Sequence, residues 1–306
     1  MARGISRRGL LVGAGLAAAG AAWGALRVPD AHGETQRCTE RYAGYRDRDR
    51  RQPFAKYMAD HTRPAPAHVL RAHAGPPTPA VDIPPFERLT DDLAPTGLSK
   101  VETGYGQRRD GVTWAATRID MPGVTADMWD WWFGWHSIDS ARYKLWHPDA
   151  HRYASLAKDL TKADISDRAK YVGNTTFVDE YVGPKLQQLA INFRDPVAHG
   201  FRVPDGHTVV FGRVGSSIAP VDLGWLAHQV RPTARGVEMR SRFHLNLRGL
   251  HTPDVGQAAC AVARGAAVDP RDLELGIDLG RDLMLHCGQE MNHLAGFLPR
   301  LHAEFS

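Results

Sequence analysis

The chain has 306 residues, of which 43% are hydrophobic and 24% charged, and its formal net charge is +4. These values are typical of a globular protein with one large domain, or with a large and a small one. The first 31 residues contain four arginines against one aspartate, and without them the formal charge falls to about +1. The other basic residues are interleaved with acidic ones, so the sequence does not favour nucleic-acid binding.

Residues 1–31 differ from the rest of the chain. Ser6, Arg7 and Arg8 precede an uncharged run rich in Ala, Gly and Leu at 9–26. This arrangement resembles a twin-arginine export signal and predicts a periplasmic or extracellular protein. A membrane anchor or a mis-assigned start are the alternatives, and a leader that does not function would leave the protein cytoplasmic. So many Ala and Gly make a poor permanent membrane span, and no later run is apolar enough to cross a bilayer.

The cysteines are few and scattered. Cys38, Cys260 and Cys287 form no CxxC pair, so the sequence predicts no disulfide framework and leaves room for one bridge between two of them.

A proline-rich segment separates a small N-terminal portion from the main domain. Seven prolines fall within residues 63–85, which excludes a regular helix or a central strand there. We expect a linker or wrapping segment with at most a short helix. The predicted division is therefore a small helical or linker portion at about 34–100, followed by the main domain at 101–306.

The main domain begins with a strand pattern and ends with a helix pattern. Residues 112–119 alternate as a strand that Pro122 stops, and Thr125 is the expected N-cap of a helix that ends near His136. Further strands are predicted at 207–214 and 237–247, and a long helix is predicted after Pro270, from about 273 to 304. Many antiparallel strands closed by one long helix favour an α+β fold over a parallel α/β sheet.

That last helix carries polar residues where an apolar stripe should continue. His286 and Glu290 are four residues apart, so their side chains leave the same face about 6 Å apart, close enough to bind one metal ion. His293 lies about two turns from His286 and is not expected to join the same site. A solvated helix face or a local hydrogen bond is the alternative interpretation.

A second group of candidate residues lies near the predicted helix at 125–136. Tryptophans at 129, 131, 132, 135 and 146 crowd around Arg142, Tyr143, His147 and His151, which indicates either an aromatic pocket wall or a tryptophan-rich core. Farther on, Asp179 and Glu180 end a β-prone run. Two imidazoles and two carboxylates gathered from such distant segments would suit zinc, and a divalent ion would offset their buried charge. The chain has no GxSxG or HExxH motif.

Four motifs in order resemble one known family. They are MPGVTADMWDWWFGWH, RYKLWHPDAH, YVGNTTFVDEYVG and HCGQEMNHLAGFLP, and the match covers roughly residues 100–300. Together they are similar to the 2,4-diacetylphloroglucinol hydrolases and the related phloretin hydrolases. The resemblance implies a helix-grip fold, like that of birch-pollen allergen and START domains, behind a small helical part. It also implies a homodimer with one zinc ion per subunit.

The resemblance assigns site residues position by position. The family's pocket tyrosine precedes its first ligand histidine by two helical turns, as Tyr143 precedes His151, so His147 becomes the weaker rival. Tyr143 and His228 are the implied catalytic residues, and Trp132 and Trp135 of the tryptophan cluster are expected to form the pocket wall. The implied zinc ligands are His151, Glu180, His286 and Glu290.

The expected reaction is hydrolysis of the carbon–carbon bond between a phloroglucinol ring and a ketone carbonyl. Ala154 and Phe243 stand where the family places an asparagine and a second tyrosine around the substrate's oxygens. A bulkier acyl group, as in phloretin, is therefore an alternative to acetyl. A non-catalytic helix-grip carrier of an aromatic ligand, or a metal-free lyase or cyclase, are the competing functions.

Overall fold

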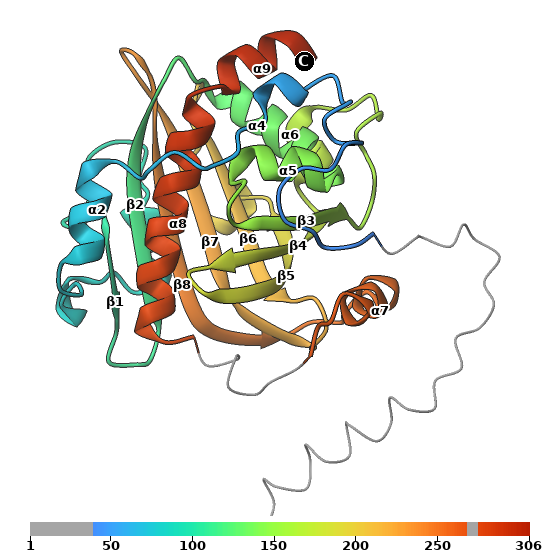
Figure 1. Ribbon diagram of the computed structural model, residues 1–306. Helices are drawn as coiled ribbons and strands as arrows, with labels where there is room; N and C mark the ends of the chain where they lie inside the picture. The colour runs from blue at the N-terminus through green and yellow to red at the C-terminus, as the bar shows by residue number, and fades with distance from the viewer. Residues whose placement is uncertain (1–38, 268–274) are drawn as a thin grey trace, which may run out of the picture. The chain divides into compact units, whose positions relative to one another are not determined.

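The computed structural model describes residues 39–267 and 275–306. Eight strands in this part of the chain form one antiparallel sheet, in the order β1-β2-β8-β7-β6-β5-β4-β3 (Figure 1). The strands are β1 Gly104–Gln107, β2 Thr113–Pro122, β3 His151–Leu156, β4 Thr175–Val182, β5 Lys185–Arg194, β6 Thr208–Ser216, β7 Val221–Thr233 and β8 Gly236–Leu250.

Helices precede, interrupt and close this sheet. The α-helices are α2 Ala67–Ala74, α3 Leu89–Asp92, α4 Ala126–Trp135, α5 Ser140–Trp146, α6 Asp167–Tyr171, α7 Val255–Ala263, α8 Ile277–Ala295 and α9 Leu298–Phe305. Short 3-10 turns are η2 Ala55–Tyr57, η3 Ala80–Asp82, η4 Phe86–Arg88, η5 His136–Ile138 and η6 Val197–His199. None of the helices in the described ranges is long and apolar enough to span a bilayer.

The sheet grips α8. This helix contacts β1, β2 and β8 toward one edge of the sheet and β4 toward the other, so the sheet curves around it (Figure 1). Close approach requires a glycine at 280, because a Cβ there would lie 2.8 Å from Thr113 Cγ2. An antiparallel sheet wrapped on a long C-terminal helix is the α+β, helix-grip fold that the resemblance implied.

The core lies between α8, the inner face of the sheet and the aromatic helices α4 and α5. Trp129 and Trp132 are fully buried there, together with Met284 and Met291 of α8. The chain from residue 39 onward forms one compact unit. Its N-terminal segment crosses α8 and then packs α2 alongside it (Figure 1). The division predicted at residues 100 and 101 stays a prediction.

Local patterns predicted several elements correctly. The strand expected at 112–119 is β2, which ends at Pro122, and Thr125 caps α4 by accepting a hydrogen bond of 3.3 Å from the amide of Met128. The proline-rich segment contains one short helix, α2, as expected.

The prediction of one helix at 273–304 was wrong in its continuity. The helix is interrupted at Gly296 and Phe297, between α8 and α9. Pro299 lies in the first turn of α9, where a backbone amide hydrogen has no partner within the helix. Pro270, Cys38 and the export signal at 1–31 lie outside the described residues.

Candidate functional site

Three elements bring four distant side chains together. His151 begins β3 and pairs directly with Glu180 of β4, so the register of these two antiparallel strands sets both side chains next to each other. On α8, His286 and Glu290 are one turn apart and both are buried. His151 and Glu180 on the two strands therefore lie next to His286 and Glu290 on the helix.

The distances describe one cluster. The Nε2 atom of His151 lies 3.5 Å from Glu180 Oε2 and 3.6 Å from Glu290 Oε2. His286 Nε2 is 3.6 Å from the same Glu290 oxygen. Ligand atoms of His151, His286 and Glu290 all lie within 4.8 Å of one another, a spacing that could hold a metal ion. Glu180 approaches this group through His151, and the same oxygen of Glu180 accepts a hydrogen bond from the hydroxyl of Tyr143.

Hydrogen bonding fixes the tautomer of His151. Its Nδ1 donates to the backbone carbonyl of Tyr143 at 2.9 Å, so in the neutral ring Nε2 carries the lone pair. That Nε2 atom is buried and has no hydrogen-bond partner. Burial, and then the neighbouring His286, hold the pKa of His151 well below its usual range. A buried, unpartnered lone pair facing two carboxylates is the arrangement expected of a metal ligand.

The carboxylate of Glu290 lacks sufficient positive charge around it. Burial raises the pKa of Glu290 to about 7, although the hydrogen bond with His286 and its charge act in the opposite direction. Burial alone would lower the pKa of His286, but its hydrogen bond with Glu290 raises it. The two groups compensate each other only partly, and a cation would stabilise the remaining charge.

Tyr143 of α5 belongs to the same cluster. Its ring stacks on that of His151, with centroids 3.7 Å apart and planes 4° from parallel. Its hydroxyl donates a short hydrogen bond to Glu180 Oε2. Burial, followed by the charge of Glu180, raises the pKa of Tyr143 well above its usual range. The side chain is therefore a phenol whose proton lies at the edge of the cluster.

His228 lies deeper in the sheet, on β7. Its Nδ1 is 2.8 Å from the hydroxyl of Ser241, and its ring meets the ring of Phe243 edge-on. Burial lowers the pKa of His228 to about 3, so the imidazole is neutral. The same row of the sheet continues to Thr117, whose hydroxyl is 3.2 Å from the sulfur of Cys287, a free thiol on α8.

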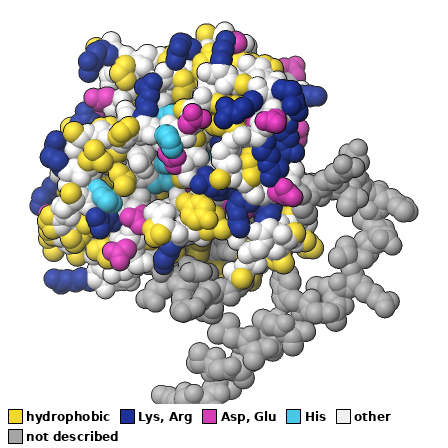
Figure 2. Space-filling model, in the orientation of Figure 1, with side chains coloured by type: hydrophobic (Ala, Val, Ile, Leu, Met, Phe, Trp, Pro, Cys, Tyr) yellow, Lys and Arg dark blue, Asp and Glu magenta, His cyan; other side chains and the backbone are white. Residues whose placement is uncertain are grey.

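The other two histidines near the cluster have different roles. The ring of His147 stacks on that of His286 with centroids 4.6 Å apart, and its Nδ1 bonds to the Thr62 hydroxyl at 2.8 Å. His293 Nδ1 accepts a hydrogen bond from the amide of Arg63. The structure thus brings His151 rather than His147 into the cluster and leaves His293 outside it. Histidine and acidic side chains reach the surface nearby, beside a hollow of about 220 Å³ (Figure 2).

The four residues predicted to line the substrate pocket do not lie together: three belong to the aromatic core and one lines the cavity. Trp132 stacks on His136 with centroids 4.7 Å apart, and Trp135 stacks on Trp131, so both indole rings serve the aromatic core. Ala154 is buried in the same core, and of the four predicted residues only Phe243 lines the cavity beside the cluster. The tryptophan-rich core, which the sequence left open as an alternative, is the arrangement observed.

Apart from Phe243 and Glu180, the residues that line the cavity were not predicted from the sequence as site residues. Its volume is about 70 Å³, and Glu180 is one of its lining residues. The remaining lining residues are Val182, Gln187, Leu189, Ile191, Val214, Leu223, Leu226, Phe243, Leu245, Leu275, Leu279 and Leu283. Most of these side chains come from β5 to β8, at positions that face the same side of the sheet. The sequence alone does not show which positions lie together, because that depends on how the strands pair.

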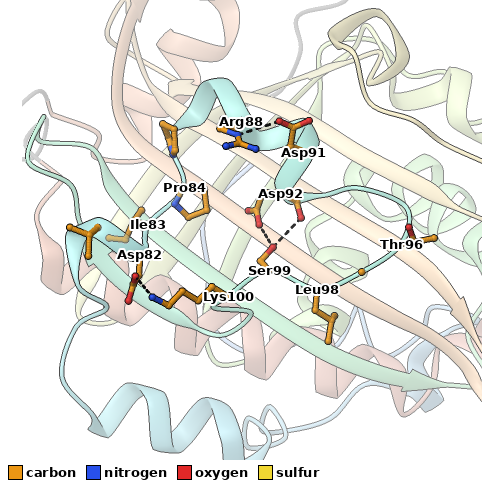
Figure 3. A pocket seen from close by; sticks show the side chains of 13 residues that line it. Asp82, Ile83, Pro84, Arg88, Asp91, Asp92, Thr96, Leu98, Ser99 and Lys100 are labelled. Atoms are coloured by element: carbon orange, nitrogen blue, oxygen red, sulfur yellow. Dashed lines mark hydrogen bonds and ion pairs between the residues drawn. The ribbon is translucent and has the colours of Figure 1, made fainter.

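A second hollow, of about 640 Å³, lies far from this cluster, against the segment 81–100 (Figure 3). Its charged side chains already have partners: Lys100 pairs with Asp82, Arg88 with Asp91, and Asp92 with Ser99 and with an arginine of β8. Despite its size, this hollow offers no uncompensated group that would select a ligand.

Comparison with known proteins identifies the family of this chain. A family model described as the DAPG hydrolase PhiG domain matches residues 83–303. The 2,4-diacetylphloroglucinol hydrolase of Pseudomonas protegens is 28% identical over 268 residues, covering 84% of this chain and 85% of that protein. The phloretin hydrolase of Eubacterium ramulus is 26% identical over 268 residues, covering 85% of this chain and 93% of that protein.

Among solved structures, that of Ara h 8.0201 covers 61% of this chain and 98% of its own at 8% identity, with a TM-score of 0.35. So low a score carries no argument, and the fold follows from the sheet order and the position of α8. The family model, by contrast, spans most of the sheet and all four side chains of the cluster. The chain therefore belongs to the DAPG hydrolase PhiG domain family.

Proposed function

We propose that this chain is a zinc-dependent hydrolase that cleaves the bond between the aromatic ring and the ketone carbon of acylated phloroglucinols. Family membership supports the reaction class, because its relatives are a 2,4-diacetylphloroglucinol hydrolase and a phloretin hydrolase. The products are a phloroglucinol-type ring and a carboxylic acid.

The observation that carries the proposal is the unpartnered Nε2 of His151, buried between two carboxylates and beside His286. Nitrogen and oxygen ligands in this combination fit zinc. The residues that would hold the ion are His151, Glu180, His286 and Glu290. When bound there, zinc would supply Lewis-acid polarisation of an oxygen atom and a lowered pKa for water.

The reaction adds water to the ketone carbon, breaks the bond from that carbon to the ring, and protonates the ring carbon. A phloroglucinol ring can shift to its keto tautomer, so the departing carbon behaves like that of a β-diketone. Tyr143 is the proposed proton donor, because its hydroxyl hydrogen already lies at the cluster.

His228 is the proposed proton shuttle. Its bond with Ser241 holds the ring in one orientation, and it remains neutral at working pH. Phe243 lies between this ring and the cavity, so the shuttle requires the Phe243 side chain to move when substrate binds. At about 70 Å³ the cavity is also smaller than one that accepts benzene, so its lining side chains must change rotamer to admit a substrate.

The test uses purified protein with mono- and diacetylphloroglucinol and phloretin, with liberated phloroglucinol as the readout and metal content measured on the same sample. Turnover with about one zinc ion per chain is the expected result. Binding without turnover in a metal-free protein would instead identify a carrier. Turnover that persists after removal of Glu180 and Glu290 would identify a metal-free lyase or cyclase.

Export and dimerisation belong to the same proposal. The twin-arginine leader lies outside the described residues, and cell fractionation with a variant that replaces Arg7 and Arg8 by lysine tests export. The proposed homodimer is tested by light scattering on the purified protein, where a monomeric mass would contradict it.

A further inference from the structure

The cavity beside the cluster has one polar end and one hydrocarbon end. Glu180 and Gln187 face each other in the register between β4 and β5, and among the described residues they are the only polar ones that line the cavity. Every other lining side chain is Val, Leu, Ile or Phe. The strands β5 to β8 are interior strands of the sheet, so their backbone groups are already engaged in the ladder.

This asymmetry orients a substrate. A phloroglucinol ring carries three hydroxyl groups, which lose free energy if they are buried without partners. The ring is therefore expected at the polar end, beside Tyr143 and Glu180. The group attached through the ketone then points toward the leucines of α8 and of the sheet.

We propose that the hydrocarbon end binds an alkyl acyl chain, and that this protein hydrolyses longer alkanoylphloroglucinols in preference to both acetylphloroglucinol and phloretin. The inference rests on the proposed function and names the substrate class within it. Acetyl leaves the leucines at the far end without contact. The acyl group of phloretin ends in a phenol, whose hydroxyl would meet only hydrocarbon there.

Shape favours the same choice. A cavity of about 70 Å³ is roughly half the size of one that accepts benzene, so a phenol ring requires a larger displacement of the lining than a narrow alkyl chain does. Leu279 and Leu283 lie on successive turns of α8 on the same face, so their side chains form an apolar row that such a chain can follow.

The direct test is a substrate series of acetyl-, butanoyl- and hexanoylphloroglucinol together with phloretin. We expect kcat/KM to rise about fourfold for each buried methylene group. We expect phloretin to fall about 10-fold or more below the hexanoyl compound, because its hydroxyl loses its hydrogen bonds. A flat or falling dependence on chain length, or phloretin as the best substrate, would overturn the inference.

A variant pair tests which side chains are responsible. Leu226→Asn places an amide in the hydrocarbon wall and should lower kcat/KM for the hexanoyl compound relative to phloretin by about 10-fold. Leu226→Met keeps the wall apolar at similar volume and should retain the wild-type preference. Equal ratios in the two variants, both shown to be folded by thermal unfolding, would contradict the assignment of this wall.

Binding without chemistry separates this inference from the proposed function. Alkylresorcinols from ethyl to hexyl lack the ketone and cannot be cleaved, so calorimetry reports only on the cavity. Tighter binding with each added methylene, in a protein that hydrolyses none of the acylphloroglucinols, would refute the proposed reaction and support the cavity assignment. Hydrolysis restricted to acetyl compounds would refute the inference and leave the reaction standing.

Discussion

Two buried clusters of charged side chains lie on opposite faces of the sheet. On the outer face, Arg240 and Arg242 bind Glu102, and Arg242 also binds Asp92 at 2.7 Å. On the inner face lies the cluster of His151, Glu180, His286 and Glu290. Both clusters contain buried charged groups. In the outer cluster each arginine is paired with a carboxylate, whereas in the inner cluster the carboxylates lack sufficient positive charge.

The pKa values of the glutamates in the two clusters differ accordingly. Burial would raise the pKa of Glu102, but its hydrogen bond with Arg240 and the charge of Arg242 lower it to about 2. Burial raises the pKa of Glu290 to about 7, because one imidazole does not compensate it. In the outer cluster, removing one charge would leave its partner buried and unpaired, whereas in the inner cluster the surplus negative charge would be offset by the proposed cation.

The largest effect is expected from removing the charge of Glu290, which tests whether the inner cluster needs a cation. Glu290→Gln keeps the volume and deletes the charge, so we expect loss of more than about 100-fold in zinc affinity, with loss of measurable turnover. Without metal, the same variant should be more stable than the wild type, since an uncompensated buried charge has gone. Metal titration and urea unfolding of apo and loaded protein measure both effects. Full activity with an empty site would contradict the assignment.

The matched change on the outer face is Arg242→Met. It leaves Asp92 and part of Glu102 without their cation, and should lower the free energy of unfolding by about 3–5 kcal/mol. Urea unfolding measures this loss, and zinc content per folded chain should equal that of the wild type. Loss of zinc from a folded Arg242→Met protein would show that the two clusters are not independent.

Within the inner cluster, Tyr143→Phe separates chemistry from metal binding. The ring still stacks on His151, but the proton is gone, so we expect zinc to be retained while kcat falls about 100-fold. Steady-state kinetics and metal content on one sample measure the two effects. Unchanged kinetics would remove Tyr143 from the mechanism.

The smallest expected effect is the pH dependence of stability from histidines buried on both faces. Burial lowers the pKa of His228 to about 3 and that of His244 to about 4, whereas the unfolded value is about 6.5. Between these values the unfolded chain binds more protons, so stability is full above pH 6.5 and falls as the pH is lowered. Each histidine should contribute a loss of about 2 kcal/mol between pH 7 and 5.

Chemical unfolding of the wild type and of His244→Asn at these two pH values measures that contribution. The variant should lose less stability on acidification than the wild type. An identical loss in both proteins would show that His244 does not stay neutral in the folded state.

Local sequence patterns reached part of the fold and part of the site. The spacing of His286 and Glu290 placed both on one helix face, and Thr125 and Pro122 marked where α4 begins and β2 ends. Each of these features depends on residues that are close together in the sequence. Local sequence patterns are therefore sufficient to predict them.

The remaining features depend on contacts between distant segments. The pairing of His151 with Glu180 follows from the register of β3 and β4, and local residue patterns did not predict β3, β5 or β7 as strands. The residue patterns suggested two imidazoles and two carboxylates from these segments, but only the family resemblance selected His151 and Glu180 among the candidates. Placement of Trp132 and Trp135 in a pocket wall likewise rested on composition, which does not distinguish a cavity lining from a packed core.

The central claim is that a divalent cation completes the inner cluster. The most direct measurement is the zinc content of the purified wild-type protein after dialysis, determined by mass spectrometry, with His286→Ala analysed in parallel. We predict about one zinc ion per wild-type chain and almost none in the variant. A folded wild-type protein that holds no zinc and does not bind it when titrated would contradict the account.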